Sequence, residues 1–123
     1  MCTVLIVEDD SPTRRLLHAL FDPASGFETC LEAGNGAQAV DMTLQLLPNL
    51  VVLGFSLSGT TGLQLARRLK TITPQLPIFM LTEDYTASLE KDALTCGITA
   101  VFSKLDDLAP VVANARAVCG IDS

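Results

Sequence analysis

The segment from Pro48 to Gly62 constrains the fold most, because it changes character twice within a few residues. A Pro-Asn turn signal precedes a continuous apolar run from Leu50 to Leu53 or Gly54, and a loop of glycine, serine and threonine follows. The run is too short for a membrane span or a full helix, and it lacks the alternation of a strand with one face in water. It predicts a buried central strand whose loop lies at the carboxyl edge of a parallel sheet, where open α/β sheets bind ligands.

Further short apolar runs are spread along the chain and alternate with helical apolar spacing. The other predicted strands are Thr3–Val7, Phe27–Ala33, Ile78–Leu81 and Ile98–Phe102. The predicted helices are Thr13–Phe21 after a Ser11-Pro12 start, Ala37–Leu47 after an Asn35-Gly36 cap, Leu63–Lys70, Thr86–Thr95 and Asp107–Val118. Without repeats or linkers, this order predicts a single α/β domain over residues 1–123, a doubly wound five-stranded parallel sheet with five helices.

Charge and hydropathy exclude several classes of function. The formal net charge of -6 argues against direct nucleic-acid binding by this domain, because phosphate contacts depend on lysine and arginine. No apolar run approaches the roughly 20 residues of a membrane span, and no basic-then-apolar signal segment is present at the start of the sequence. We therefore expect a soluble, cytoplasmic domain that makes no membrane contact.

The four cysteines are Cys2, Cys30, Cys96 and Cys119. They form no Cys-x-x-Cys pair, and His18 is the only histidine that could accompany them as a ligand. Metal and redox sites need ligands or thiols at close spacing, so the pattern predicts buried, unreactive thiols.

Polar residues follow the predicted strands and converge at one edge if the sheet is parallel. They are Glu8, Asp9 and Asp10 after the first strand, Gly54 after the third, Thr82 after the fourth and Lys104 after the fifth. Paired carboxylates with a hydroxyl and an ammonium group suit a hard divalent cation and a phosphoryl group. Strand ends are also polar simply because they face water, and that interpretation accounts for each residue taken alone.

Taken together, these positions closely resemble the receiver domain of bacterial two-component response regulators, the CheY-like family, and the resemblance covers the whole chain. It implies a flavodoxin-like sheet with strand order 2-1-3-4-5. In that family an acidic pair after the first strand, here Glu8 and Asp9, holds magnesium. An aspartate at the end of the third strand receives phosphate from a histidine kinase, and a threonine and a lysine, here Thr82 and Lys104, sense the acyl phosphate.

The resemblance places Gly54 at the phosphoacceptor position, where glycine has no side chain to phosphorylate. Other departures agree: Ser58 and Leu105 replace prolines of the family, Val101 replaces a switching aromatic residue, and Glu83 adds negative charge. We therefore expect an atypical pseudo-receiver that signals independently of phosphorylation and is not an enzyme. The alternative is a magnesium-dependent phosphoacceptor receiver using a non-standard residue. The candidate acceptors are Asp9, Asp10 and Ser56.

The same resemblance implies how the domain uses metal and partners. We expect no cofactor beyond weakly bound magnesium at Glu8 and Asp9, with the Ser56 backbone as a further ligand, and we expect Lys104 to contact the acidic pair. The partner is a signalling protein, an output domain or a second copy of the chain. The family's usual face, built from the fourth helix, fifth strand and fifth helix, would carry the contact. Its expected members are Ala87, Val101, Ala109 and Ala113.

Overall fold

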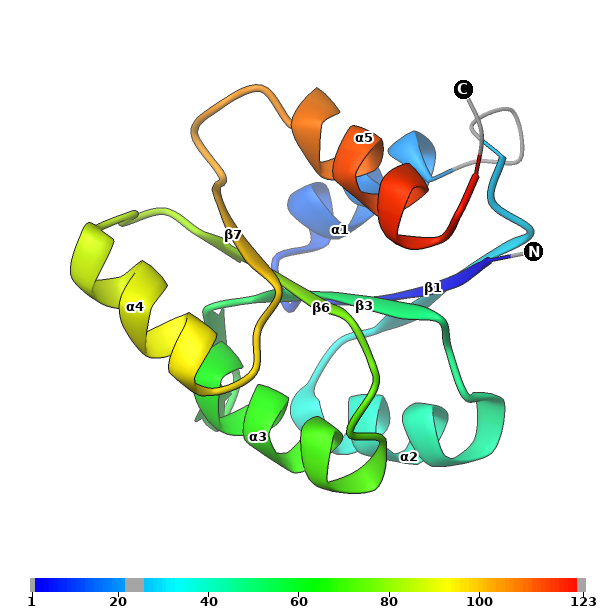
Figure 1. Cartoon of the computed structure of the whole chain (residues 1–123), viewed down its shortest axis with the longest axis horizontal. Coiled ribbons are helices and arrows are strands. Elements are labelled where there is room, and N and C mark those ends of the chain that lie inside the picture. Colours follow the sequence, from blue (N-terminus) through cyan, green and yellow to red (C-terminus); the bar gives the residue numbers. More distant parts are fainter. Residues whose placement is uncertain (1, 22–25, 122–123) are drawn as a thin grey trace.

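The computed structural model describes residues 2–21 and 26–121 and forms one parallel sheet with helices on both faces (Figure 1). The sheet has five strands in the order β2-β1-β3-β6-β7. They are β1 (Thr3–Val7), β2 (Thr29–Ala33), β3 (Leu50–Gly54), β6 (Ile78–Thr82) and β7 (Ala100–Ser103). Counted along the chain, these strands lie in the order 2-1-3-4-5, so the predicted fold class is confirmed.

The helices cover the two faces of the sheet in separate layers. They are α1 (Ser11–Leu20), α2 (Gly36–Leu46), α3 (Gly62–Ile72), α4 (Ala87–Thr95) and α5 (Ala109–Val118). Helices α1 and α5 lie on one face, and α2, α3 and α4 lie on the other (Figure 1). The connection through α1 crosses one face of the sheet and those through α2, α3 and α4 cross the other, while α5 returns to the face of α1, so both faces are covered, as in other doubly wound sheets.

The continuous apolar runs arise because the central strands are buried on both faces. In β1, Leu5 and Val7 pack in the core layer under α2 and α3, while Val4 and Ile6 pack in the layer under α1 and α5. The same alternation continues in β3 and β6. Each central strand therefore links two hydrophobic cores, and these cores hold the carboxyl edge of the sheet in place.

Several predicted boundaries are wrong by a few residues, for local reasons. The second strand begins at Thr29 and not at Phe27, whose ring packs edge-on against Phe21 with centroids 4.9 Å apart. The last strand begins at Ala100, two residues after Ile98, whose amide donates to Ala93 at the end of α4. Ser11 is also not the N-cap of α1, because it is already the first residue of the helix.

Two helix starts depend on aspartate side chains. The α1 cap is Asp10, whose carboxylate accepts a hydrogen bond from the Thr13 amide at 3.1 Å. Helix α5 begins at Ala109 and not at Asp107, because the Asp107 carboxylate accepts from the Ala109 amide at 3.0 Å and lies before the helix.

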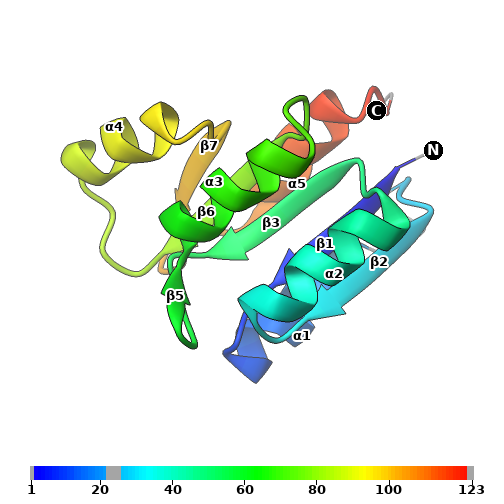
Figure 2. The ribbon, with the colours of Figure 1, turned by 90° about the horizontal axis from the view of Figure 1, so that it is seen from below.

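The loop after β3 contains a short hairpin that the sequence pattern did not predict. Strands β4 (Ser56–Leu57) and β5 (Thr60–Thr61) pair antiparallel, with Gly59 at φ +79° in the turn. Figure 2 shows β5 projecting from the sheet before α3 begins. Gly62 follows where two chain segments almost touch, because a β-carbon there would lie 2.6 Å from the Gly54 carbonyl oxygen. The hairpin therefore requires glycine at its exit.

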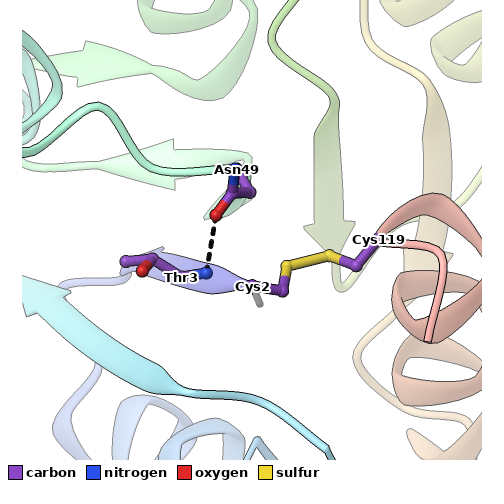
Figure 3. The surroundings of a disulfide bond; sticks show 4 residues. All are labelled: Cys2, Thr3, Asn49 and Cys119. Atoms are coloured by element: carbon purple, nitrogen blue, oxygen red, sulfur yellow. Dashed lines mark hydrogen bonds between the residues drawn. A yellow bond between two sulfur atoms is a disulfide. The ribbon is translucent and has the colours of Figure 1, made fainter.

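A disulfide joins Cys2 and Cys119, so the prediction that all cysteines are free thiols is wrong (Figure 3). Their α-carbons are 5.9 Å apart, although 117 positions separate them in the sequence. Cys30 and Cys96 remain free, with Cys30 half-buried and Cys96 buried. Sequence spacing could not reveal the pair, because only the packing of α5 against the β1 end of the sheet brings the two residues together.

Within residues 2–21 and 26–121, no helix has both the length and the apolar character to cross a membrane.

Candidate functional site

The predicted site residues meet at the carboxyl edge of the sheet. Strand β1 leads into Glu8, β3 ends at Gly54 and β6 ends at Thr82. The parallel register pairs Val7 with Leu53, Gly54 with Leu81 and Thr82 with Ser103, which places these strand ends next to one another. Lys104 follows directly after Ser103, and its amide donates to the Thr82 carbonyl at 2.8 Å. The convergence expected from the sequence is therefore present.

Glu8 and Lys104 form a buried ion pair at the centre of this edge. Lys104 Nζ lies 2.5 Å from Glu8 Oε1, and the two side chains are 14% and 1% exposed. This contact confirms the expectation that Lys104 meets the acidic pair. Apart from this ion pair, Glu8 Oε1 has no hydrogen-bond partner among the described residues. Glu8 Oε2 accepts a hydrogen bond from the Asp10 amide at 3.3 Å. The charge of Glu8 is therefore balanced mainly by the lysine.

The Glu8 carboxylate also lies directly over Gly54. A β-carbon on residue 54 would stand 3.0 Å from Glu8 Oε1 and 3.1 Å from Oε2. Such distances are shorter than ordinary van der Waals contact, so any side chain at position 54 requires the carboxylate to move. The carboxylate of Glu8, the residue after β1, thus takes the space in which a side chain at the end of β3 would begin.

Asp9 and Asp10 do not share the position of Glu8. Asp9 is exposed and accepts a hydrogen bond from the Ser58 hydroxyl at 3.1 Å. Asp10 is exposed as well, and its carboxylate is engaged by the hydroxyl and the amide of Thr13. These two hydrogen bonds from Thr13 lower the pKa of Asp10 below its ordinary value. Each of the acidic residues therefore has a different partner.

This arrangement fits a divalent cation poorly. Magnesium prefers several oxygen ligands in octahedral geometry, including more than one anionic oxygen in most protein sites. Here Glu8 already pairs with Lys104, position 54 offers no carboxylate, and Asp9 remains as an exposed ligand bonded to Ser58. Over residues 2–21 and 26–121, no three His, Cys, Asp or Glu side chains gather closely enough to hold a metal ion.

A pocket of about 340 Å³ opens beside the ion pair. It is lined by Phe55, Ser56, Leu81, Thr82, Glu83, Asp84, Leu89 and Lys104. Thr82 is buried, and its hydroxyl accepts from the Asp84 amide at 3.1 Å. Thr82, Lys104 and the exposed Ser56 thus share one pocket, into which Glu83 and Asp84 bring negative charge.

The expected interaction face lies over α4, β7 and α5. Ala87, Ala109 and Ala113 are exposed, and Val101 is half-buried. A second pocket of about 400 Å³ opens on this face. It is lined by Tyr85, Val101, Phe102, Ser103, Asp106, Asp107 and Pro110.

Sequence reasoning passed over Tyr85, which lies on the same face. Its hydroxyl donates a hydrogen bond to the Glu90 carboxylate, and this interaction raises the pKa of Tyr85. A lone tyrosine after a strand end gave no signal of its own. Its five-residue spacing from a helical glutamate is visible in the sequence but is too common to single out.

The comparisons with known proteins agree with this architecture. A family model described as the response regulator receiver domain matches residues 4–115. The chain is 36% identical over 118 residues to the phosphate regulon transcriptional regulatory protein PhoB of Pseudomonas aeruginosa, covering 94% of this chain and 51% of that protein. It is also 29% identical over 105 residues to sporulation initiation phosphotransferase F of Bacillus subtilis, covering 85% and 83%.

A solved structure gives the same picture in three dimensions. A putative response regulator from Chloroflexus aurantiacus superposes with a TM-score of 0.87 at 25% identity, covering 97% of this chain and 98% of that one. The chain spans about half the length of several curated relatives, including the transcriptional activator protein ExaE of Pseudomonas putida, of which it covers 54% at 34% identity.

Proposed function

The chain belongs to the response regulator receiver domain family, and from that membership we propose that it is a pseudo-receiver, which signals through protein contacts without phosphorylation of residue 54. Gly54 stands at the end of β3, where the family resemblance places the phosphoacceptor aspartate. Acyl phosphate formation needs a carboxylate nucleophile, and glycine supplies none. On this proposal the domain is a binding module and not an enzyme.

One observation carries the proposal: the Glu8 carboxylate fills the space over Gly54 and pairs with Lys104 at 2.5 Å. In a phosphorylated receiver, the resemblance assigns this lysine to the phosphoryl group that forms on the third strand. Here a carboxylate from β1 already holds the lysine before any phosphate arrives. The ion pair would thus hold the carboxyl edge of the sheet in one conformation, and signalling would depend on partner binding instead of phosphorylation.

The proposal includes at most weak magnesium binding. Glu8 would have to leave Lys104 to join Asp9 as a ligand, and that exchange would leave a buried lysine without its carboxylate. The Ser56 backbone could add one neutral oxygen. No step of the proposed function therefore depends on the metal.

We further propose that the face over α4, β7 and α5 carries the protein contact. The exposed alanines Ala87, Ala109 and Ala113 let a partner approach closely, and the adjoining pocket offers an aromatic and apolar surface beside Asp106 and Asp107. The partner would be an output domain, another signalling protein or a second copy of the chain. The cytoplasmic location and the lack of nucleic-acid contact by this domain belong to the same proposal.

The experiment is incubation of the protein with acetyl phosphate and magnesium, followed by intact mass measurement. The expected result is no phosphoryl increment on the unmodified protein. Gly54→Asp serves as the matched variant, because it restores a carboxylate at the proposed acceptor position by a single substitution, although Glu8 must move to make room for it. A stable increment on the unmodified protein would contradict the pseudo-receiver.

A second candidate function rests on the pocket lining, which brings Ser56 together with Thr82 and Lys104. In that case the domain would be a magnesium-dependent receiver that accepts phosphate on a non-standard residue. Loss of a phosphoryl increment in Ser56→Ala would identify the serine, whereas loss in Asp9→Asn or Asp10→Asn would identify a carboxylate of the β1 loop. Asp10 is the weaker candidate, because it caps α1.

A further inference from the structure

The disulfide lies at the edge of the sheet opposite the candidate site. Cys2 precedes β1, and Cys119 directly follows the last residue of α5 (Figure 3). The Cys2 side chain is 1% exposed, whereas Cys119 is half-buried at the end of the helix. Of the two bridged residues, Cys119 is therefore the more accessible to a small thiol reagent.

A domain of this size does not need the bridge in order to fold. A chain of 123 residues has enough buried surface to fold without covalent cross-links, unlike much smaller disulfide-rich domains. The core under α1 and α5 is made largely of residues other than cysteine, including Leu17, Phe21, Phe79 and Val111. The oxidised and the reduced chain can thus share one architecture, which a reversible bridge requires.

A third cysteine is close by but is poorly suited to compete. Cys30 belongs to the same core layer and pairs with Val4 in the register of β1 and β2. Burial and the nearby Glu32 carboxylate raise its pKa to about 12, so the thiol keeps its proton at neutral pH. Because the thiolate is the attacking species in disulfide exchange, Cys30 exchanges slowly. Cys96 caps α4, on the other face of the sheet.

We propose that Cys2 and Cys119 form a reversible redox-modification site, whose reactant is a low-molecular-weight disulfide such as oxidised glutathione. The Cys119 thiolate attacks one glutathione sulfur, which forms a mixed disulfide and releases one glutathione. The Cys2 thiolate then attacks the Cys119 sulfur, which closes the protein disulfide and releases the second glutathione. The two protein thiols lose two electrons to the glutathione disulfide, and their two protons end on the two glutathione thiols.

Oxidation fixes the end of α5 to β1. The last turn of the chain keeps its own hydrogen bonds, from the Cys119 amide to Ala115 at 2.9 Å and from the Ile121 amide to Arg116 at 2.8 Å. Ala115 is the last residue of α5 to be fully buried, and Val118 is 40% exposed. The bridge therefore acts on a helix end with little buried surface of its own, and reduction increases its local opening.

The test equilibrates the full chain in buffers with graded ratios of reduced to oxidised glutathione, followed by quenching and alkylation under denaturing conditions. The number of alkylated cysteines should shift from four to two as oxidised glutathione increases, with the bond mapped to Cys2 and Cys119. Hydrogen exchange at residues 116–121 should be faster in the reduced protein, with β3 unchanged. A bridge that resists excess reduced glutathione, one that never forms, or one that maps to Cys30 or Cys96 would overturn the proposal.

Single variants test the order of the two steps. Cys2→Ser should accumulate glutathione on Cys119, because the resolving thiol is absent. Cys119→Ser should gain no adduct, because Cys2 is enclosed. The double variant Cys30→Ser and Cys96→Ser should keep the transition of the unmodified protein. An adduct on Cys2 but not on Cys119 would contradict the assignment, and circular dichroism of each variant verifies that it is folded.

Discussion

The Glu8 carboxylate lies against the α-carbon side of Gly54, so close that a β-carbon at residue 54 would stand 3.0 Å from Glu8 Oε1. Strands β1 and β3 are neighbours in the sheet, and this contact joins their carboxyl ends. The space left by the missing side chain of Gly54 is thus filled by the side chain of Glu8, the residue after the neighbouring strand. The same carboxylate binds Lys104, so three strand ends depend on one buried charge.

Removing the lysine should destabilise the domain strongly. In Lys104→Met, Glu8 keeps a buried charge without a counter-ion, and we expect a loss of about 3 kcal/mol in the free energy of unfolding. Urea denaturation at neutral pH measures the loss. The double variant with Glu8→Gln should lose less, because no uncompensated charge remains. Lys91→Met, at an exposed position of α4, should change stability by less than about 0.5 kcal/mol.

Restoring an aspartate at position 54 should restore magnesium affinity. In Gly54→Asp the new carboxylate repels Glu8 and competes for Lys104, which frees Glu8 to turn toward Asp9 as a ligand. Isothermal titration should show tighter magnesium binding than for the unmodified protein. Gly54→Asn has nearly the same shape without the charge and serves as the control. Equal magnesium binding by both variants would mean that Glu8 stays paired with Lys104 in Gly54→Asp.

A charge on the proposed interaction face should weaken association. Ala113 is exposed on α5, and a glutamate there adds charge and bulk where close approach is proposed. If the partner is a second copy, light scattering should report a dimer for the unmodified protein and a monomer for Ala113→Glu. Ala37→Glu makes the same change at an exposed position of α2, outside this face, and should remain dimeric. A monomeric unmodified protein would exclude the homodimer.

The half-buried thiol of Cys30 on β2 should show itself in the pH dependence of alkylation. The pKa of Cys30 is raised to about 12 by burial and by Glu32, so at pH 8 iodoacetamide should label Cys119 of the reduced, folded protein and leave Cys30 unmodified. Labelling of Cys30 should increase only as pH approaches that value. The Cys30 thiol binds its proton more tightly in the folded protein than in the unfolded one, so it adds to the free energy of unfolding. That contribution is complete below pH 9 and is lost as pH rises through about 12. Rapid labelling of Cys30 at pH 8 would contradict the burial.

The sheet and the position of the site were predictable because local patterns determine them. Continuous apolar runs indicate strands covered on both faces, and parallel strands bring residues such as Glu8, Thr82 and Lys104 to one edge. The hairpin at Ser56–Thr61 was missed because two-residue strands carry no periodicity. The contact of Glu8 with Gly54 was missed because it depends on a side-chain rotamer, and the Cys2–Cys119 pair because it depends on how α5 packs on the sheet.

The bridge between residues 2 and 119 also changes how the domain responds to mechanical tension. With the bridge closed, tension applied between the two ends runs through the sulfur–sulfur bond, and the residues between them form a covalent ring that carries no load. The strands and helices would then be shielded from mechanical unfolding, and a cut in any loop of the ring would leave the pieces attached. With the bridge open, the same tension would act directly on β1, a central strand of the sheet.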